Sequence, residues 1–261
     1  MMHDPCRPLQ AVIFDKDGVL VDFQRTWTPA IKAAAADFAS GNEARALALL
    51  RKIGFDPQTD SFLPGSIWAA GTNAELIDAW AGDECPSRRA ALIAHMAAHC
   101  EATAPVPLVP PEKMRDSLRA LRDMGLKLAL ISNDTTASVN NTARAFGLED
   151  LFDFTCGYDA VENPKPAAEP VLRFAAACGI SPARMAVIGD NEHDALMARA
   201  AGCAHFIAVL SGTGSRDHLA PFTRHIASDM LQAATLAKSL AGTGQHGQEH
   251  SWRDKESASG L

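Results

Sequence analysis

Four short apolar segments, separated by helical patterns, constrain the fold of this chain more than any other feature. Continuous apolar runs bounded by turn residues are typical of strands that are buried on both faces of a parallel sheet. The four runs are residues 11–14, 126–131, 185–188 and 206–210. Amphipathic or alanine-rich helical patterns lie between these runs, at residues 112–124, 170–178 and 191–201. This alternation predicts an α/β fold with a doubly wound parallel sheet and helices on both of its faces.

A long segment interrupts the alternation after the first predicted strand. Residues 23–103 contain no clear strand, and their helix-like parts are residues 29–40, 42–53, 72–80 and 87–99. Alanine is abundant there, and it favours helix more than any other residue. The sequence therefore predicts an all-helical domain, residues 23–103, inserted into an α/β core made of residues 1–22 and 104–240. Residues 241–261 are rich in glycine, serine, histidine and charge, which predicts a disordered tail.

Charge and cysteine content exclude several classes of protein. The chain has 24 basic and 31 acidic residues, a net charge of −7, which argues against nucleic acid or an anionic membrane surface as partner. No apolar run reaches the 18 or more residues of a membrane helix, and the first ten residues lack the pattern of a secretory signal. The six cysteines form no CxxC pair, which favours free thiols in a reducing compartment. We expect a cytoplasmic protein, and the sequence carries no signal of its oligomeric state.

Carboxylates and other polar groups follow the predicted strands. Asp15-Lys16-Asp17-Gly18 follows the first strand, Ser132-Asn133-Asp134 follows the second, and the third leads into a segment that contains Asp190 and Asp194. A loop with Lys165 lies between the second and the third of these segments. Because the carboxyl ends of parallel strands meet at one edge of a sheet, these groups are expected to converge.

Convergence of four carboxylates requires compensating positive charge. At an effective dielectric constant of about 20, two like charges about 4 Å apart repel by roughly 4 kcal/mol. A divalent cation together with Lys165 would offset the repulsion among Asp15, Asp17, Asp190 and Asp194. Hard oxygen ligands without histidine or cysteine favour Mg²⁺ over zinc.

These four motifs resemble those of the haloacid dehalogenase superfamily of hydrolases, most closely its phosphoglycolate-phosphatase-like branch. The family's DxDG motif after an apolar strand matches residues 11–18, and its Ser/Thr motif after a second strand matches residues 126–133. Its loop lysine matches Lys165, and its GDxxxD motif before a small-residue helix matches residues 189–194. The resemblance covers roughly residues 9–22 and 104–240, and it implies that the inserted helical segment is a cap domain.

The resemblance also implies roles for the site residues. Asp15 would attack the substrate phosphorus, and Asp17 would act as general acid and then as general base. Mg²⁺ would be held by Asp15, by the backbone carbonyl of Asp17 and by Asp190, with Asp194 behind them or ligating directly. The phosphoryl oxygens would be held by the second and third motifs, through Ser132, Asn133 and Lys165.

The resemblance leaves more than one function open. A small phosphorylated metabolite, such as phosphoglycolate or another phosphomonoester, is the expected substrate of a phosphatase. A phosphomutase similar to β-phosphoglucomutase uses the same motifs and a helical cap, and it would depend on a bisphosphate activator. A non-catalytic sugar-phosphate-binding protein is a third possibility, although its usual mark would be a lost motif acid. Two positions depart from the family pattern: Lys16 is charged where the family is usually apolar, and Val19 stands where many members have threonine.

Overall fold

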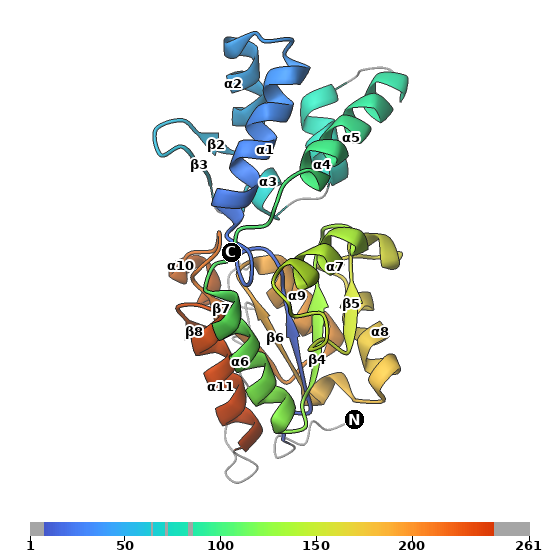
Figure 1. Cartoon of the computed structure of the whole chain (residues 1–261), viewed down its shortest axis with the longest axis vertical. Helices are drawn as coiled ribbons and strands as arrows, with labels where there is room; N and C mark the ends of the chain where they lie inside the picture. Colours follow the sequence, from blue (N-terminus) through green and yellow to red (C-terminus); the bar gives the residue numbers. More distant parts are fainter. Residues whose placement is uncertain (1–7, 64, 71–72, 83–85, 243–261) are drawn as a thin grey trace, which may run out of the picture. The chain divides into compact units, whose positions relative to one another are not determined.

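The computed structural model describes residues 8–63, 65–70, 73–82 and 86–242. Contacts divide the chain into two units, with boundaries between Leu20 and Val21 and between Val106 and Pro107. The unit that contains both outer parts of the chain carries the parallel sheet, and we call it the core unit (Figure 1). The unit from Val21 to Val106 is largely helical, and we call it the cap unit.

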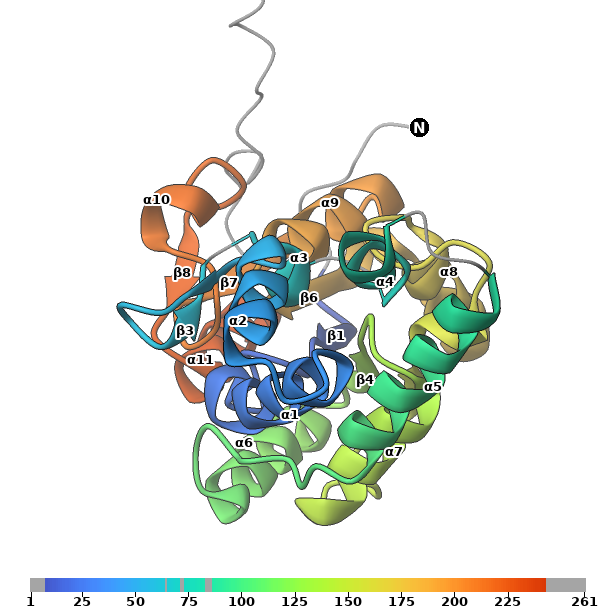
Figure 2. The same ribbon diagram turned by 90° about the horizontal axis from the view of Figure 1, so that it is seen from above.

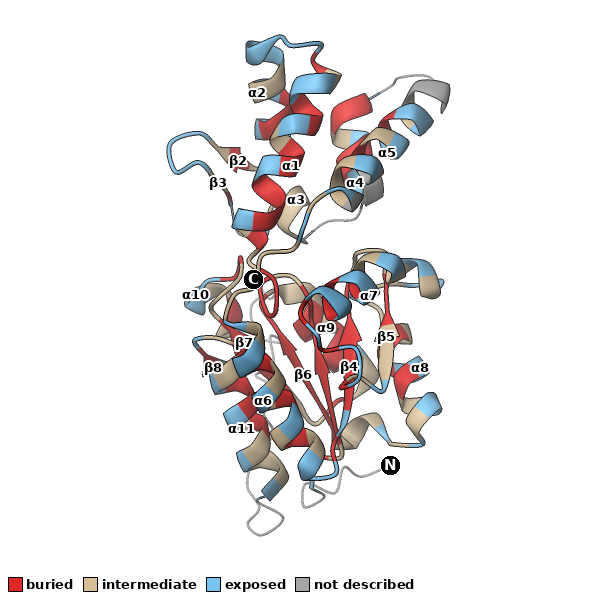
Figure 3. Ribbon diagram, viewed as in Figure 1, coloured by how far each residue is buried: buried red, intermediate tan, exposed pale blue. Residues whose placement is uncertain are grey.

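A six-stranded parallel sheet forms the centre of the core unit. Its strands lie in the order β5-β4-β1-β6-β7-β8, and every neighbouring pair is parallel. Their bounds are β1 (Ala11–Phe14), β4 (Lys127–Ile131), β5 (Phe154–Cys156), β6 (Met185–Gly189), β7 (His205–Val209) and β8 (His225–Ala227). The four predicted strands are all present, and the predicted doubly wound α/β fold is confirmed. Figure 3 shows the central strands coloured almost wholly as buried, as expected of strands covered on both faces.

Helices cover both faces of this sheet. α6 packs against α11 on one side of the strands, and α8 packs against α9 on the opposite side (Figure 2). The helices are α6 (Pro111–Asp123), α7 (Thr136–Ala145), α8 (Glu169–Cys178), α9 (Glu192–Ala201), α10 (Arg216–Leu219) and α11 (Met230–Gly242). Gly179 and Gly202 end α8 and α9 in the left-handed conformation, where glycine costs least. The predicted helices 112–124, 170–178 and 191–201 correspond to α6, α8 and α9.

The cap unit has its own apolar core. α1 packs against α2 and α5, and α4 packs against α5. Its helices are α1 (Phe23–Phe38), α2 (Glu43–Lys52), α3 (Ile67–Ala70), α4 (Asn73–Ala81) and α5 (Pro86–Glu101). The buried centre includes Trp27, Ile31, Leu76, Trp80 and Leu92. The unit therefore buries apolar surface independently of the parallel sheet.

Two details of the cap unit differ from the sequence prediction. α1 does not begin at Pro29: the side chain of Asp22 accepts a hydrogen bond from the backbone N–H of Arg25 and caps the helix there, so that Pro29 lies inside it. A short antiparallel pair, β2 (Phe55–Asp56) with β3 (Ser61–Phe62), also occurs between two predicted helices, in a segment where no strand was expected. Each strand has two residues, too few to produce a recognisable pattern.

Other expectations concern the ends of the chain and its cysteines. The predicted disordered tail lies outside the described residues from 243 onwards, whereas Ala241 and Gly242 are the last residues of α11. Within the described chain, Cys156, Cys178 and Cys203 are free thiols. Among the described helices, none combines the length and the apolar character that a membrane crossing needs.

Candidate active site

The register of the central strands brings the predicted site segments to one edge of the sheet. Phe14 pairs with Leu130 of β4 and with Ile188 of β6, so the residues that follow the three strands leave the sheet at the same level. The N–H of Asp15 still donates to the carbonyl of Ile188 at 2.9 Å. Similarly, the N–H of Ser132 donates to the carbonyl of Cys156 at 3.0 Å. The strand hydrogen bonds thus fix where the first two motifs begin.

Lys165 lies between two carboxylates that are distant in the sequence. Its Nζ donates to Oδ1 of Asp15 at 2.6 Å and to Oδ1 of Asp194 at 2.7 Å. All three side chains are buried, with at most 6% of their surface exposed. Burial alone would lower the pKa of Lys165, but the charges of Asp15 and Asp194 outweigh it and raise the pKa above its usual range. Lys165 is therefore a buried cation held by charge-assisted hydrogen bonds.

Asp15, Asp190 and Asp194 form a compact cluster of buried carboxylates. One oxygen from each lies within 4.8 Å of those of the other two. Burial raises the pKa of Asp15 to about 6, since the charge of Lys165 only partly offsets it and the charge of Asp194 adds to it. Burial together with the charges of Asp15 and Asp194 raises the pKa of Asp190 to about 8. These shifts show that the three negative charges are incompletely compensated by the side chains of the protein.

The donor atoms of this cluster fit a hard divalent cation. Oδ2 of Asp194 is buried and accepts no hydrogen bond from the described residues. A buried carboxylate oxygen without a donor is costly, and a metal ion is one partner that would satisfy it. All the available ligand atoms are oxygens, which suit Mg²⁺ or Ca²⁺ better than a softer metal.

Backbone and hydroxyl donors fix the position of Asp190. Its Oδ2 accepts from the N–H of Thr213 at 2.7 Å and from Oγ1 of Thr213 at 3.0 Å. Two glycines leave room for this carboxylate: a Cβ on Gly18 would lie 2.4 Å from Oδ2, and a Cβ on Gly212 would lie 2.0 Å from it. The loops after β1 and β7 thus enclose the Asp190 side chain and hold it in one orientation.

Asp17 lies in a different ionic group from the three clustered carboxylates. Its Oδ2 is 2.7 Å from Nζ of Lys16, which also lies 3.0 Å from Oδ2 of Asp134. The Lys16 side chain is wholly buried, so the charge at this unusual position is neutralised inside the protein. Burial raises the pKa of Asp17, and the charge of Lys16 opposes that rise only in part. Burial would also raise the pKa of Asp134, but Lys16 and the hydroxyl of Ser138 hold it below its usual value.

Ser132 and Asn133 connect the loops around the site. Oγ of Ser132 accepts from the N–H of Asp134 at 3.1 Å. Nδ2 of Asn133 donates to the backbone carbonyl of Lys165 at 3.1 Å. The Oδ1 atom of Asn133 is buried and has no hydrogen-bond partner among the described residues. Ser132 therefore contacts the ionic group of Lys16 and Asp134, whereas Asn133 contacts the loop that carries Lys165.

The sequence reasoning missed three participants in this site. Asp134, Gly212 and Thr213 contact the predicted residues directly. Asp134 was expected at this sheet edge together with Ser132 and Asn133, but no role was predicted for it, and nothing in the sequence showed that it would pair with Lys16. Gly212 and Thr213 lie in a Ser-Gly-Thr-Gly segment directly after the fourth predicted strand. The rule that ligands bind at the carboxyl ends of parallel strands, applied to that strand as well, would have found them.

Comparison with known proteins gives a family for this chain. The sequence model of the haloacid dehalogenase-like hydrolases matches residues 9–202. Phosphoglycolate phosphatase of Chromobacterium violaceum is 38% identical over 104 residues, which are 40% of this chain and 46% of the relative. Phosphoglycolate phosphatase of Escherichia coli K12 is 39% identical over 88 residues, 34% of this chain and 35% of the relative. The matched part is thus less than half the length of either enzyme.

Solved structures share the fold over most of the chain. A predicted phosphoglycolate phosphatase from Haemophilus somnus has a TM-score of 0.66 at 20% identity, covering 87% of this chain and 97% of that one. A β-phosphoglucomutase from Clostridium difficile has a TM-score of 0.63 at 15% identity, covering 89% and 97%. At these identities the likeness concerns the fold alone.

Proposed function

Because the chain belongs to the haloacid dehalogenase-like hydrolase family, we propose that it is a Mg²⁺-dependent phosphatase of small phosphomonoesters that works through an aspartyl-phosphate on Asp15. One observation carries the proposal: Asp15 lies at the end of a central strand with Lys165 at 2.6 Å and with two further carboxylates beside it. These groups would supply a nucleophile, a cation for phosphoryl oxygens and a set of oxygen ligands at one sheet edge.

Asp15, Asp190 and Asp194 are the side chains that would hold the cation. Their clustered oxygens support this assignment, as does Oδ2 of Asp194, which accepts no hydrogen bond within the described part of the chain. The backbone carbonyl of Asp17 is the further ligand that the motif suggests. When bound, Mg²⁺ would offset the negative charge of the carboxylates and of the phosphoryl group.

The chemistry is assigned to Asp15 and Asp17. An oxygen of Asp15 forms a bond to phosphorus while the bond from phosphorus to the leaving oxygen breaks. Asp17 gives its proton to that leaving oxygen, and its raised pKa favours the protonated form which this step needs. In the second step water attacks the phosphorus, Asp17 takes up the water proton, and the bond between Asp15 and phosphorus breaks. Lys165 remains close enough to hold phosphoryl oxygens throughout.

The names of the relatives suggest the first substrate to test. Both curated relatives reported above are phosphoglycolate phosphatases. We therefore propose phosphoglycolate as the leading candidate among small phosphomonoesters, with Ser132 and Asn133 as further groups near the phosphoryl site.

A phosphate-release assay over a panel of phosphorylated metabolites, with and without Mg²⁺, tests the proposal. We expect phosphate release that requires Mg²⁺ and is abolished in Asp15→Asn. This substitution replaces one carboxylate oxygen by an amide nitrogen and so removes the negative charge of the side chain. Asp150→Asn is the matched control, because Asp150 is an exposed carboxylate paired with Arg115 on the surface. Mass spectrometry of the enzyme mixed briefly with substrate should find one added phosphoryl group, on Asp15. Full activity in Asp15→Asn would refute the assignment.

The same assay separates phosphatase from phosphomutase. A mutase would convert a sugar monophosphate into its isomer, depend on a bisphosphate activator and release little free phosphate. A non-catalytic binding protein would bind the compounds without turnover, in wild type and Asp15→Asn alike.

A further inference from the structure

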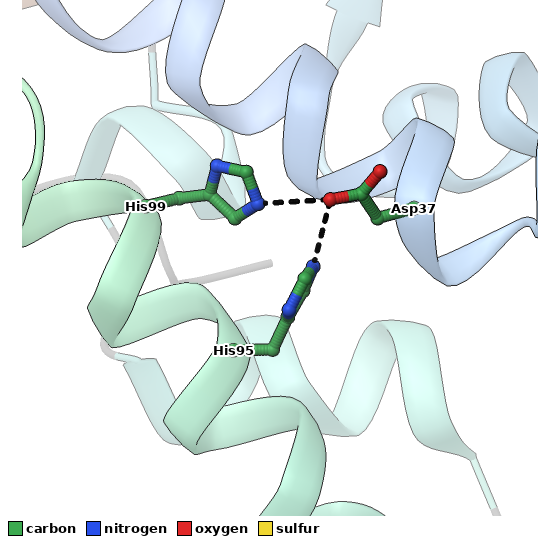
Figure 4. A group of neighbouring side chains, drawn as sticks. All are labelled: Asp37, His95 and His99. Carbon is green, nitrogen blue, oxygen red and sulfur yellow. Dashed lines mark hydrogen bonds and ion pairs between the residues drawn. The ribbon is translucent and has the colours of Figure 1, made fainter.

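Two imidazoles and a carboxylate converge in the cap unit, separately from the carboxylate cluster of the core unit. His95 and His99 lie four residues apart on α5, so their side chains project from the same face of that helix. Asp37 lies near the end of α1, and α1 packs against α5. Figure 4 shows both rings directed toward the same oxygen of Asp37.

The distances within this group resemble those between the ligands of a tetrahedral metal ion. Nε2 of His99 lies 3.1 Å from Oδ2 of Asp37, and Nε2 of His95 lies 3.4 Å from the same oxygen. Two ligand atoms with Zn–N and Zn–O bonds of about 2.0–2.1 Å lie about 3.3 Å apart at a tetrahedral angle. One ligand atom from each residue lies within 4.8 Å of the other two.

His95 supplies a second observation that points to a ligand. Its Nε2 is buried and makes no hydrogen bond with the described residues, although it faces Asp37. His99, by contrast, makes a hydrogen bond to the same carboxylate oxygen. One carboxylate oxygen therefore satisfies only one of the two ring nitrogens directed at it.

The chemistry of the group selects the class of metal. Imidazole nitrogen is a borderline ligand that suits Zn²⁺, whereas Mg²⁺ prefers the all-oxygen cluster of the core unit. The side chains of Asp37, His95 and His99 are 57%, 39% and 27% exposed, so water can reach the group. Three protein ligands with one water is a common arrangement for zinc.

We propose that Asp37, His95 and His99 bind one Zn²⁺ ion, which joins the first and last helices of the cap unit. Nε2 of each histidine and Oδ2 of Asp37 are the ligand atoms, and water fills the fourth position. Because Asp37 on α1 and His95 on α5 are more than 55 residues apart in the sequence, the bound ion stabilises the packing of the two helices against each other. Zn²⁺ binding to the native state then raises the melting temperature of the protein.

Calorimetric titration of the full-length protein with Zn²⁺, in excess Mg²⁺, tests this proposal. Mg²⁺ keeps the oxygen cluster of the core unit occupied, so that the titration reports on nitrogen-containing sites. We expect one Zn²⁺ to bind with an affinity that falls at least about tenfold in each of His95→Gln, His99→Gln and Asp37→Asn. Zn²⁺ should also raise the melting temperature of the wild type more than that of these variants.

His218→Gln is the matched control. His218 also faces a carboxylate, with Nε2 3.5 Å from Oε2 of Glu192, but no second imidazole among the described residues forms a metal-binding group with that pair. The His218→Gln variant should bind Zn²⁺ as the wild type does. Circular dichroism verifies that each variant is folded, and any one folded variant of the three is sufficient. If the wild type and the folded variants bound Zn²⁺ with the same affinity, the proposal would be overturned. The group would then be only a pair of His–Asp contacts.

Discussion

Gly212→Ala is a small change that tests whether the position of Asp190 matters for the proposed metal site. A Cβ at Gly212 would lie 2.0 Å from Oδ2 of Asp190 and 2.4 Å from its Cγ. Ordinary contact begins at 3.4 Å, so the carboxylate oxygen has to move by about 1.4 Å. The N–H and hydroxyl of Thr213 now hold that oxygen at 2.7 and 3.0 Å, and the movement would lengthen or break both hydrogen bonds.

The size of this movement determines how much catalytic activity and Mg²⁺ affinity we expect the variant to lose. Misplacing a catalytic or ligating group by about 1 Å can reduce a rate by about 100-fold. Breaking two hydrogen bonds to a carboxylate costs about 1.5–3 kcal/mol each, which the native structure can recover only in part. We therefore expect kcat/KM to fall about 100-fold and the half-saturating Mg²⁺ concentration to rise.

Phosphate release measured against Mg²⁺ concentration, together with calorimetric titration of Mg²⁺, distinguishes the outcomes. Gly242→Ala is the control, since a Cβ there meets nothing within 4 Å. Its activity and Mg²⁺ affinity should equal those of the wild type. If folded Gly212→Ala protein showed wild-type activity and Mg²⁺ affinity, the placement of Asp190 would not matter and the reasoning would be refuted.

Two further substitutions test the buried charges. Lys16→Met leaves Asp17 and Asp134 without their shared cation. Because both carboxylates are 22% exposed, we expect the free energy of unfolding to fall by about 3 kcal/mol, near the lower end of the range for a broken buried ion pair. The melting temperature should fall by about 6–12 °C, and a fall of less than about 2 °C would contradict the argument. At His205, burial and the nearby charges of His225 and Arg224 lower the pKa to about 4, so the unfolded chain takes up the proton more readily between pH 6.5 and 4. The free energy of unfolding should therefore decrease as the pH falls through this range, by up to about 2 kcal/mol for this partly exposed group. The His205→Gln variant should lack that part of the decrease. If the free energies of unfolding of wild type and variant, measured by denaturant titration, changed with pH in parallel, the assignment would be contradicted.

The central strands could be predicted because each is a continuous apolar run covered on both faces. The edge strands β5 and β8 could not, since each has three residues of which only one is buried. α7 was also missed: its sequence contains threonine, serine and asparagine, which hydrogen-bond to the backbone in other conformations and so weaken the helical signal. The helix forms nonetheless, because it packs against β5. Tertiary contacts, rather than local preference, decide these elements.

The convergence of Asp15, Lys165 and Asp194 was predictable for a topological reason. Parallel strands deliver whatever follows them to one edge, and the observed distances of 2.6 and 2.7 Å agree with that expectation. The same rule also places Thr213 at this edge, but the specific pairings of Lys16 and Asp190 with their partners were not predictable in this way. They depend on the path of the loops, including the left-handed conformation of Gly18 at φ 77°, which strand periodicity does not specify.

The balance of charge at this sheet edge explains why a cation belongs in the proposed function. Each of the two lysines that are buried in the described part of the chain lies between two carboxylates, so each group of three has a surplus of one negative charge when fully ionised, and Asp190 adds another. The participants are Lys16 with Asp17 and Asp134, and Lys165 with Asp15 and Asp194. At a few ångströms such a surplus costs several kcal/mol, which the protein alone can relieve only by protonating a carboxyl group, as the raised pKa of Asp190 shows. A divalent cation relieves the same repulsion while leaving Asp15 ionised as a nucleophile. The local arrangement of charge, and not the net charge of −7, is therefore what makes an anionic substrate compatible with this acidic chain.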